Sequence, residues 1–175
     1  GGIREEGFLR KNSEDVEYSL VKCMECDQIA VYPIPGKDEL KKYYNTVFEV
    51  PLYQEKKTLR KATRVLGELK RLGIEEGAKI LEIGASYGFF MKIANDVGFE
   101  SYGLEMSAKA CEYAKNEFDI EIENSSLEES KFVQKNHTFD AVILLDVIEH
   151  VTNPSEIISQ IESLLKPGGF VVITT

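Results

Sequence analysis

The sequence has no long hydrophobic stretch: none of its apolar runs approaches the roughly 20 residues that a membrane-spanning helix needs. No secretion signal is visible either, so we expect neither a membrane protein nor a secreted one. An excess of positive charge is also missing, since the formal net charge is −9 at pH 7. A chain with this charge is a poor match for the phosphate backbone of nucleic acid, and a small-molecule ligand is the better expectation.

Cysteine is scarce, with three residues in a chain of 175. Cys23 and Cys26 form one C-x-x-C pair, and Cys111 stands far from it. An odd number of cysteines suits the reducing cytoplasm better than a disulfide framework, so we expect a cytoplasmic protein. Two thiolates on a tight turn can supply half of a tetrahedral zinc site, but the sequence has no second C-x-x-C. Two thiols that bind no metal are therefore favoured over a partial zinc site, because a two-ligand site binds zinc poorly.

The composition is that of an ordinary globular protein, 43% hydrophobic and 29% charged. Its length suffices for one full domain and a smaller appendage, which we place at residues 51–175 and 1–50. Residues 54–72 are predicted to form a helix that ends at Gly73. Its apolar stripe comprises Leu59, Ala62, Leu66 and Leu69. Its other faces carry Lys56, Lys57, Arg60, Lys61 and Arg64. A solvated basic face is favoured over a patch that attracts an anionic substrate.

The chain is organised around Lys79–Phe90, which reads KILEIGASYGFF. Its apolar start predicts a buried strand, the small residues Gly84–Gly88 predict a tight turn, and apolar spacing after the turn predicts a helix. These three elements form the first half of a nucleotide-binding unit, in which glycines let a ligand approach the backbone at the helix N-terminus. A dinucleotide-binding turn would need glycines where Ser86 and Phe89 stand. A nucleotide-dependent oxidoreductase is therefore a weaker hypothesis.

Further strands alternate with helices along the rest of the chain. The second strand, Glu100–Glu105, ends in an acid about twenty residues after the glycine turn, the interval at which an acid meets a ribose in such folds. A carboxylate can accept both hydroxyl protons of a vicinal diol. Further strands are predicted at residues 120–122, 139–145 and 170–175, with Ser107 and Asn153 capping the helices between them. The order predicts an α/β, doubly wound, Rossmann-like parallel sheet with a small N-terminal appendage.

Several motifs together resemble class I S-adenosylmethionine-dependent methyltransferases over residues 79–175. They are the acidic-x-Gly-x-Gly-x-Gly turn from Glu82 to Gly88, the acid at Glu105, the sequence Glu149-His150-Val151 after the fourth strand, and Leu-Lys-Pro-Gly-Gly before the fifth. Ser86 replaces the middle glycine of the first motif. The resemblance implies strand order 3-2-1-4-5, with the last strands of the family missing, and methyl transfer from S-adenosylmethionine to a small-molecule acceptor.

The resemblance also implies site residues. Those implied to bind the cofactor are Glu82, Gly84, Ala85, Ser86, Gly88, Glu105, Met106, Ser126, Leu127, Leu145 and Asp146. Ser126 stands where the family usually has an acid that accepts from adenine, and a hydroxyl accepts more weakly. Glu149 and His150 are the candidate catalytic residues, because a base is needed when the acceptor is protonated. An alternative of equal weight is that these two residues hold the loop in place and take no part in catalysis.

The segment up to Tyr44 resembles the N-terminal region of a methyltransferase subgroup that includes sugar C-methyltransferases and carries a four-cysteine zinc module. This implies a sugar or nucleotide-sugar acceptor, and zinc bound through Cys23 and Cys26 in a full-length protein. Tyr43, Tyr44 and Tyr53 could line a cover over the cofactor or pack as ordinary aromatics.

The main alternative to an enzyme is a non-catalytic ligand-binding or adaptor domain on a methyltransferase scaffold, which the serines at 86 and 126 favour slightly. The sequence stops at Thr175, close to the predicted fifth strand, whereas the family continues. We therefore expect a fragment that binds S-adenosylmethionine without turnover. Its fifth strand would be an apolar edge, through which two copies can associate as a homo-dimer.

Overall fold

The computed structural model of the protein describes residues 3–5, 10–11, 17–46 and 55–175. The chain divides into two compact units, Gly1–Leu40 and Lys41–Thr175. The domain boundary predicted at residues 50 and 51 falls outside the described residues, and so does Tyr53. No helix in the described ranges is long and apolar enough to cross a lipid bilayer.

The smaller unit is built around one antiparallel strand. Its strands are β1 (Ile3–Glu5), β2 (Arg10–Lys11), β3 (Glu17–Cys23) and β4 (Ile29–Tyr32). β3 pairs with each of the other three, and a turn containing Cys26 joins it to β4. The backbone N–H of Cys23 donates to Gln28 O at 2.8 Å and closes this turn. The strand predicted to lead into the C-x-x-C pair is therefore present.

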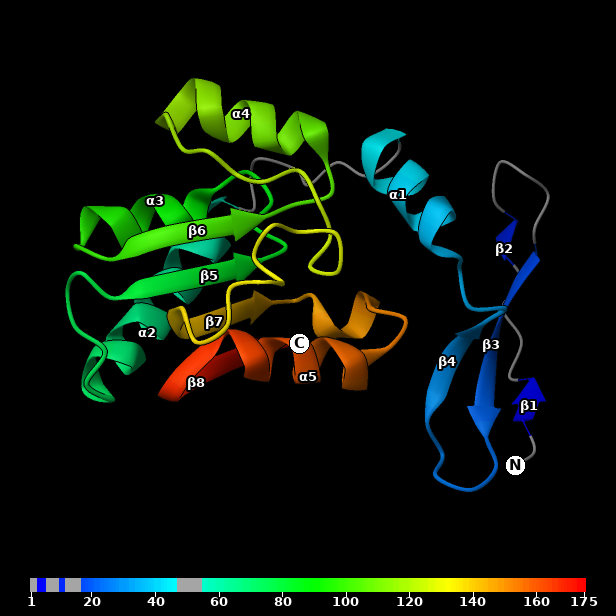
Figure 1. The fold of residues 1–175 in the computed structure, drawn as a ribbon. Coiled ribbons are helices and arrows are strands. Elements are labelled where there is room, and N and C mark those ends of the chain that lie inside the picture. The colour runs from blue at the N-terminus through cyan, green and yellow to red at the C-terminus, as the bar shows by residue number, and fades with distance from the viewer. Residues whose placement is uncertain (1–2, 6–9, 12–16, 47–54) are drawn as a thin grey trace. The chain divides into compact units, whose positions relative to one another are not determined.

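The larger unit contains a parallel sheet with the order β6-β5-β7-β8 (Figure 1). The strands are β5 (Lys79–Ile83), β6 (Glu100–Leu104), β7 (Phe139–Leu145) and β8 (Leu165–Thr174). In chain order they correspond to the predicted strands 1, 2, 4 and 5, and their arrangement confirms the doubly wound parallel sheet. Near-continuous apolar sequence in β5 and β7 is typical of strands that are covered on both faces.

The strand predicted at residues 120–122 is wrong. The chain there is still leaving the preceding helix α4 (Ala108–Phe118), because Ile120 N donates to Ala114 O at 3.2 Å. Only Glu123 reaches the sheet, in a single parallel bridge to Leu104. The bridge lies beside β6, the position that the predicted order assigns to strand 3.

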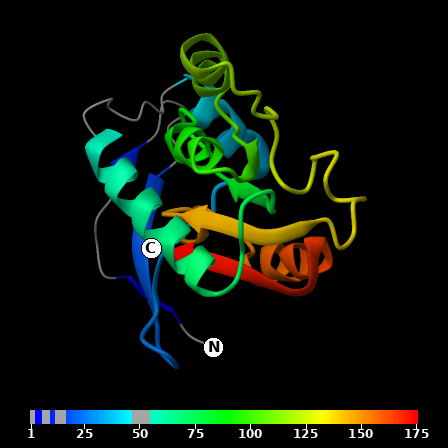
Figure 2. The ribbon, with the colours of Figure 1, turned by 90° about the vertical axis from the view of Figure 1, so that its left-hand side faces the viewer.

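Helices cover both faces of the sheet. They are α2 (Glu55–Arg71), α3 (Phe89–Asp96) and α5 (Pro154–Leu164), with α4 beside α3. Side-chain alternation along β5 places Ile80 in a core cluster with α2 and α3, whereas Leu81 and Ile83 belong to a cluster with α5. α2 and α5 accordingly lie on opposite sides of β7 and β8 (Figure 2).

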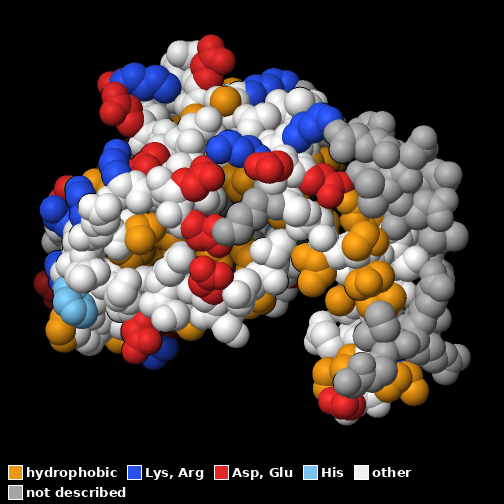
Figure 3. Space-filling view, turned by 45° about the vertical axis from the view of Figure 1, so that its right-hand side comes forward, with side chains coloured by type: hydrophobic (Ala, Val, Ile, Leu, Met, Phe, Trp, Pro, Cys, Tyr) orange, Lys and Arg blue, Asp and Glu red, His pale blue; other side chains and the backbone are white. Residues whose placement is uncertain are grey.

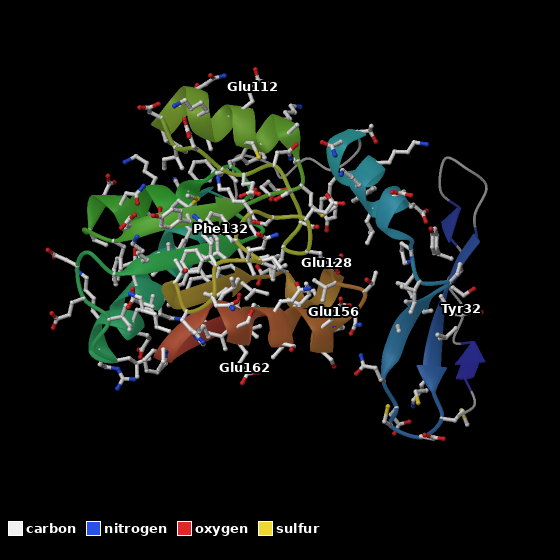
Figure 4. All side chains as sticks on the ribbon, viewed as in Figure 1. Tyr32, Glu112, Glu128, Phe132, Glu156 and Glu162 are labelled. Carbon is white, nitrogen blue, oxygen red and sulfur yellow. The ribbon has the colours of Figure 1, made fainter. Side chains whose placement is uncertain are left out.

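The chain between α4 and β7 adds side chains to the hydrophobic core on the face of the sheet that α5 covers. Leu127 and Phe132 are buried there, and the Phe132 ring contacts Tyr102 and Phe139 edge to face. In Figure 4 the Phe132 side chain lies against the sheet, whereas Glu112 on α4 and Glu162 on α5 point away from it. Leu127, which the resemblance implies to contact the cofactor, has its side chain in the hydrophobic core.

The helix caps and the helix-ending glycine predicted from the sequence are present in the structure. Ser107 Oγ accepts from Ala110 N at 3.3 Å, and Asn153 Oδ1 accepts from Glu156 N at 3.3 Å. Gly73 has the left-handed φ of 88° expected just after a helix. β8 begins earlier than predicted, because Leu165 already pairs with Phe139 before residues 166–169 bulge out and regular pairing resumes at Phe170.

Candidate functional site

Three loops meet at one edge of the sheet, because β5, β6 and β7 are parallel and all end there (Figure 1). They are the glycine turn at residues 84–88, the segment at residues 105–107 and the segment at residues 146–150. Ligands of open α/β sheets bind outside the carboxyl ends of the strands. On the face shown in Figure 3, acidic side chains gather with hydrophobic ones between them. We call these three loops, with the strand ends that carry them, the strand-end site.

The glycine turn requires glycine at both of its ends. Gly84 has φ 75°, and a Cβ there would lie 2.5 Å from Val147 Cγ2. Gly88 has φ 78° and would place a Cβ 3.0 Å from Ala114 Cβ. The N–H groups of Gly84 and Ala85 both donate to Leu104 O, at 2.8 and 2.9 Å. The two glycines therefore let the turn pack closely against α4 and the loop after β7.

Ser86 occupies the middle of the turn with a φ of 48°. This left-handed conformation suits glycine, the residue that the resemblance leads one to expect here, and costs other residues roughly 1–2 kcal/mol. The backbone N–H of Ser86 donates to Glu105 Oε2 at 2.8 Å. The backbone of Ser86 thus adopts a conformation that suits glycine, and its hydrogen bond to the Glu105 carboxylate stabilises that conformation.

Glu105 is the central polar group of the strand-end site. Its side chain is 7% exposed, and Oε1 accepts from Ser107 N at 2.7 Å while Oε2 accepts from Ser86 N. Burial raises the pKa of this carboxyl, although the N–H donors oppose that effect. Each carboxylate oxygen has a further lone pair, so the group can still accept from a ligand hydroxyl.

Glu82 lies beneath the turn and is 4% exposed. Its Oε2 atom has no hydrogen-bond partner among the described residues. Burial, and then the charge of Glu105, raise the pKa of Glu82 well above its usual value. A buried carboxyl with an unsatisfied oxygen costs free energy, so this position suits a residue that gains a partner when a ligand binds.

Asn124 is a residue of the site that the sequence analysis missed. Its side-chain amide donates to Glu105 O and to Met106 O, both at 2.9 Å. It thereby fixes the turn that carries Glu105, and Cys111 Sγ lies 3.7 Å from the same Glu105 oxygen. Burial raises the pKa of Cys111 to about 11, so this thiol stays protonated at neutral pH. No periodic pattern marks Asn124, and only the fold brings it to Glu105.

Asp146 forms an ion pair that the sequence analysis also missed. Lys61 Nζ lies 2.6 Å from both Asp146 oxygens, and Thr174 Oγ1 donates to Oδ1 at 3.1 Å. The hydrogen bond from Lys61 lowers the pKa of Asp146. The other basic residues predicted on the outer faces of this helix, Lys56, Lys57, Arg60 and Arg64, are exposed as predicted. Asp146 therefore fastens α2 to the ends of β7 and β8.

Glu149 and His150 lie on the 3₁₀ turn η2 (Ile148–His150), and both side chains are exposed. The turn is closed by His150 N, which donates to Val147 O at 2.9 Å. Leu145, the last residue of β7, is half-buried, and so are Met106 and Ser126. The structure thus places the predicted site residues on the three loops of one edge and on the segment that follows α4.

The predicted cysteine pair lies in the smaller unit, on the turn between β3 and β4. Cys23 is half-buried and Cys26 is exposed. Within the described part of the chain, no three His, Cys, Asp or Glu residues group as a metal site. The two thiols have no third ligand of these types there, which leaves the zinc prediction without structural support.

The chain matches the protein family described as "Methyltransferase domain" over residues 53–175. It is 31% identical over 108 residues to the ubiquinone biosynthesis O-methyltransferase of Alkalilimnicola ehrlichii, covering 59% of this chain and 44% of that protein. The protein of the same name from Rhodopseudomonas palustris is 32% identical over 111 residues, covering 61% and 43%. The chain thus spans less than half the length of these two relatives.

Solved structures show the same fold. Magnesium protoporphyrin IX methyltransferase from Synechocystis PCC 6803, solved with bound S-adenosylmethionine, superposes with a TM-score of 0.58 at 20% identity, covering 74% of this chain and 71% of that one. A Haemonchus contortus phosphoethanolamine N-methyltransferase in complex with S-adenosylhomocysteine gives a TM-score of 0.52 at 28% identity, covering 62% and 27%.

Proposed function

This chain belongs to the methyltransferase-domain family, and on that basis we propose that it binds S-adenosylmethionine at the strand-end site. We further propose that the methyl group goes to an oxygen atom of a small molecule. The relatives named as O-methyltransferases support an oxygen acceptor. A sugar or nucleotide-sugar acceptor and a zinc module have no such support.

The fixed carboxylate of Glu105 is the observation that carries the proposal. Backbone donors hold both of its oxygens at the end of β6, beside a glycine turn that lets a ligand approach the chain. In this position it would accept from the ribose hydroxyls of the cofactor, as an acid ending this strand does in related folds. Gly84, Ala85, Ser86 and Gly88 would line the cofactor, with Met106, Ser126, Leu127 and Leu145 nearby.

The chemistry of the reaction depends mainly on alignment. A sulfonium is already an activated methyl donor, so the protein must hold the acceptor oxygen in line with the methyl group. A hydroxyl acceptor must lose its proton as it attacks, which gives a role to a base at the strand-end site. Glu149 and His150 are the candidates, since both are exposed on η2 at the end of β7.

Calorimetric titration of the chain with S-adenosylmethionine, S-adenosylhomocysteine and NAD tests the binding step. We expect the first two to bind and NAD not to bind. Glu105→Ala should weaken binding by roughly 1.5–3 kcal/mol, as expected for hydrogen bonds to a charged group. Glu112→Ala is the matched control, because Glu112 is exposed on α4 and points away from the sheet. Equal affinity of the two variants would contradict the assignment of Glu105.

A non-catalytic ligand-binding domain is the second candidate. It is favoured by Ser126, which stands at the position of the adenine-contacting acid and is only a neutral acceptor. Transfer of a labelled methyl group from S-adenosylmethionine to catechol, a small phenolic acceptor, separates the candidates. Transfer of the methyl group rules the second candidate out.

Two further proposals concern the self-association of the protein and its location in the cell. We propose that copies of the chain associate through β8, which in the described sheet pairs only with β7 and carries the exposed side chains of Val171 and Ile173. Light scattering at high concentration should detect association, and Val171→Lys should reduce it.

We also propose a cytoplasmic location, in keeping with three free thiols.

A further inference from the structure

Four half-buried aromatic rings form a cluster that joins the glycine turn to helix α4. They are Tyr87 in the turn, Phe89 at the start of α3, and Tyr113 and Phe118 on α4. The shortest ring contact of this aromatic cluster is the one between Tyr87 and Tyr113, whose centroids lie 4.9 Å apart, edge to face. Phe118 contacts Phe89 at 5.4 Å and Tyr113 at 5.9 Å. Within the described part of the chain, Tyr113 is therefore the ring of α4 that contacts Tyr87.

The backbone of the glycine turn needs contacts that hold it in place. Residues 84, 86 and 88 all have left-handed φ angles, and Ser86 is the one among them that is not glycine. Such a conformation persists at a residue other than glycine only where the surrounding structure fixes it. The hydrogen bond from Ser86 N to Glu105 Oε2 is one such contact. The next residue, Tyr87, supplies another through its ring contact with Tyr113.

Helix α4 is itself fixed to the residue proposed to bind the ribose. The backbone N–H of Ser107, its N-cap, donates to Glu105 Oε1 at 2.7 Å. The backbone N–H of Ala108 donates to Asn45 Oδ1, on helix α1 (Lys37–Thr46), at 3.2 Å. Further along α4, the aromatic cluster contacts the glycine turn. One helix thus sets the position of the glycine turn relative to the carboxylate of Glu105.

We propose that Tyr113 is a positioning residue for S-adenosylmethionine and that it acts through Tyr87. Its ring holds the glycine turn in the conformation that binds the cofactor before the cofactor is present. The inference rests on the proposed function and adds to it a residue outside the loops of the strand-end site. A turn that is only partly in its binding conformation has an apparent affinity reduced by the fraction that is competent.

Calorimetric titration of the 175-residue chain with S-adenosylhomocysteine tests the effect on binding. Tyr113→Leu should weaken binding roughly 3- to 10-fold, the effect of losing one aromatic pair. Tyr113→Phe keeps the ring and should bind like the unmodified chain. Phe118→Leu is the matched control, because it removes a ring from the same helix and the same cluster while the contact between Tyr87 and Tyr113 remains. It should leave the affinity unchanged.

Thermal unfolding of the same variants separates positioning from stability. Tyr113→Leu and Phe118→Leu each remove ring contacts between α3 and α4, so we expect similar losses of melting temperature. Only Tyr113→Leu should also lose affinity. Equal affinities of these two variants would mean that Tyr113 stabilises the fold without positioning the turn.

A double-mutant cycle in ligand affinity tests the route through Tyr87. If Tyr113 acts by holding Tyr87, replacing Tyr113 should cost no further affinity once Tyr87 is leucine. The affinities of Tyr87→Leu, Tyr113→Leu and the double variant give the coupling between the two rings. Additive losses would show that Tyr113 affects binding by another route, and would overturn the proposal.

Hydrogen exchange followed by mass spectrometry tests the positioning without any ligand. Amide exchange in peptides covering residues 84–88 should be roughly 3- to 10-fold faster in Tyr113→Leu than in the unmodified chain, because the turn opens more often. Phe118→Leu should exchange there at the original rate. Unchanged exchange in Tyr113→Leu would show that its ring does not hold the turn.

The outcomes separate this inference from the proposed function. If the unmodified chain does not bind S-adenosylhomocysteine, the proposed function fails, and the role of Tyr113 toward the cofactor fails with it. If the unmodified chain and Tyr113→Leu bind equally well, only the inference is overturned. Weaker binding of Tyr113→Leu, no added loss in the double variant and faster exchange in the turn together support it.

Discussion

The backbone N–H of Ser86 donates to Glu105 Oε2 at 2.8 Å and ties the glycine turn after β5 to the residue that follows β6. The second oxygen of the same carboxylate accepts from Ser107 N at 2.7 Å. The residue proposed to bind the ribose is therefore also the one that shapes the turn around the ligand. Binding and local stability should respond together when Glu105 is changed.

Glu105→Gln should destabilise the protein by about 1–3 kcal/mol, although the two side chains have nearly the same shape. A glutamine has one acceptor oxygen, so its NH₂ group would face one of the two backbone donors. Urea denaturation measures the free energy of unfolding. Glu112→Gln on the exposed face of α4 is the matched control, and an equal stability of both variants would show that the two N–H contacts contribute nothing.

Glu82 should make the protein less stable as pH rises. Its pKa is raised on folding from an ordinary value of 4.5, so the folded state binds the proton more tightly than the unfolded state. Its contribution is fully present below the unfolded pKa and is lost as pH rises through the folded pKa. The slope is at most about 1.4 kcal/mol per pH unit for one proton.

Glu82→Gln should remove this dependence, because an amide does not titrate. Urea denaturation from pH 5 to pH 8 should show the unmodified chain losing stability relative to the variant as pH rises. Glu105, whose pKa is also raised, is present in both proteins, so the comparison reports mainly on Glu82. A constant difference across this range would mean that Glu82 keeps the same charge on folding.

Ser86→Gly should stabilise the chain by up to about 1 kcal/mol. Glycine adopts the φ of 48° without the steric cost that serine bears, although it also loses more backbone entropy on folding. Ser86→Ala keeps a Cβ and serves as the control, with little change expected. Thermal unfolding of the three proteins decides, and a lower melting temperature for Ser86→Gly would show that the serine side chain has a stabilising contact.

Lys61→Met should loosen the attachment of α2 to the strand ends. The side chains of Lys61 and Asp146 are 20% and 43% exposed, so solvent screens the pair and we expect a coupling energy of about 1 kcal/mol. A double-mutant cycle with Asp146→Asn measures this coupling. The pair Lys92–Asp96 on α3 is more exposed and should give a smaller value. Similar values for the two pairs would remove any special role for Lys61.

In a full-length enzyme, His150→Ala should lower the rate of methyl transfer by roughly 10²–10⁴ if the imidazole is the general base. Cofactor affinity should stay nearly constant, because the predicted ribose contact is made by Glu105. Methyl transfer to catechol and calorimetric titration are the two measurements, and Glu149→Gln tests the other candidate base. A variant that loses thermal stability while its rate holds would indicate that His150 anchors the loop.

The sequence by itself determined the elements of the larger unit. Apolar runs and helical spacing predicted β5, β7 and α2 closely, and Ser107 and Asn153 cap helices as expected. These features are decided locally, because burial of one face and the capping of free N–H groups depend on residues a few positions apart. The placement of Glu105 at a strand end followed from the same pattern.

Only the tertiary structure decided which side chains meet at the site. Lys61 and Asp146 are 85 positions apart, and Ser86 and Glu105 are 19 apart, in loops that follow different strands. The strand predicted at residues 120–122 does not form for a related reason. An apolar run becomes a strand only where a neighbouring strand pairs with it along its length, and here Leu104 pairs with Glu123 in a single bridge. Contacts of this kind depend on how packed elements align, and no periodic signal along the chain records that alignment.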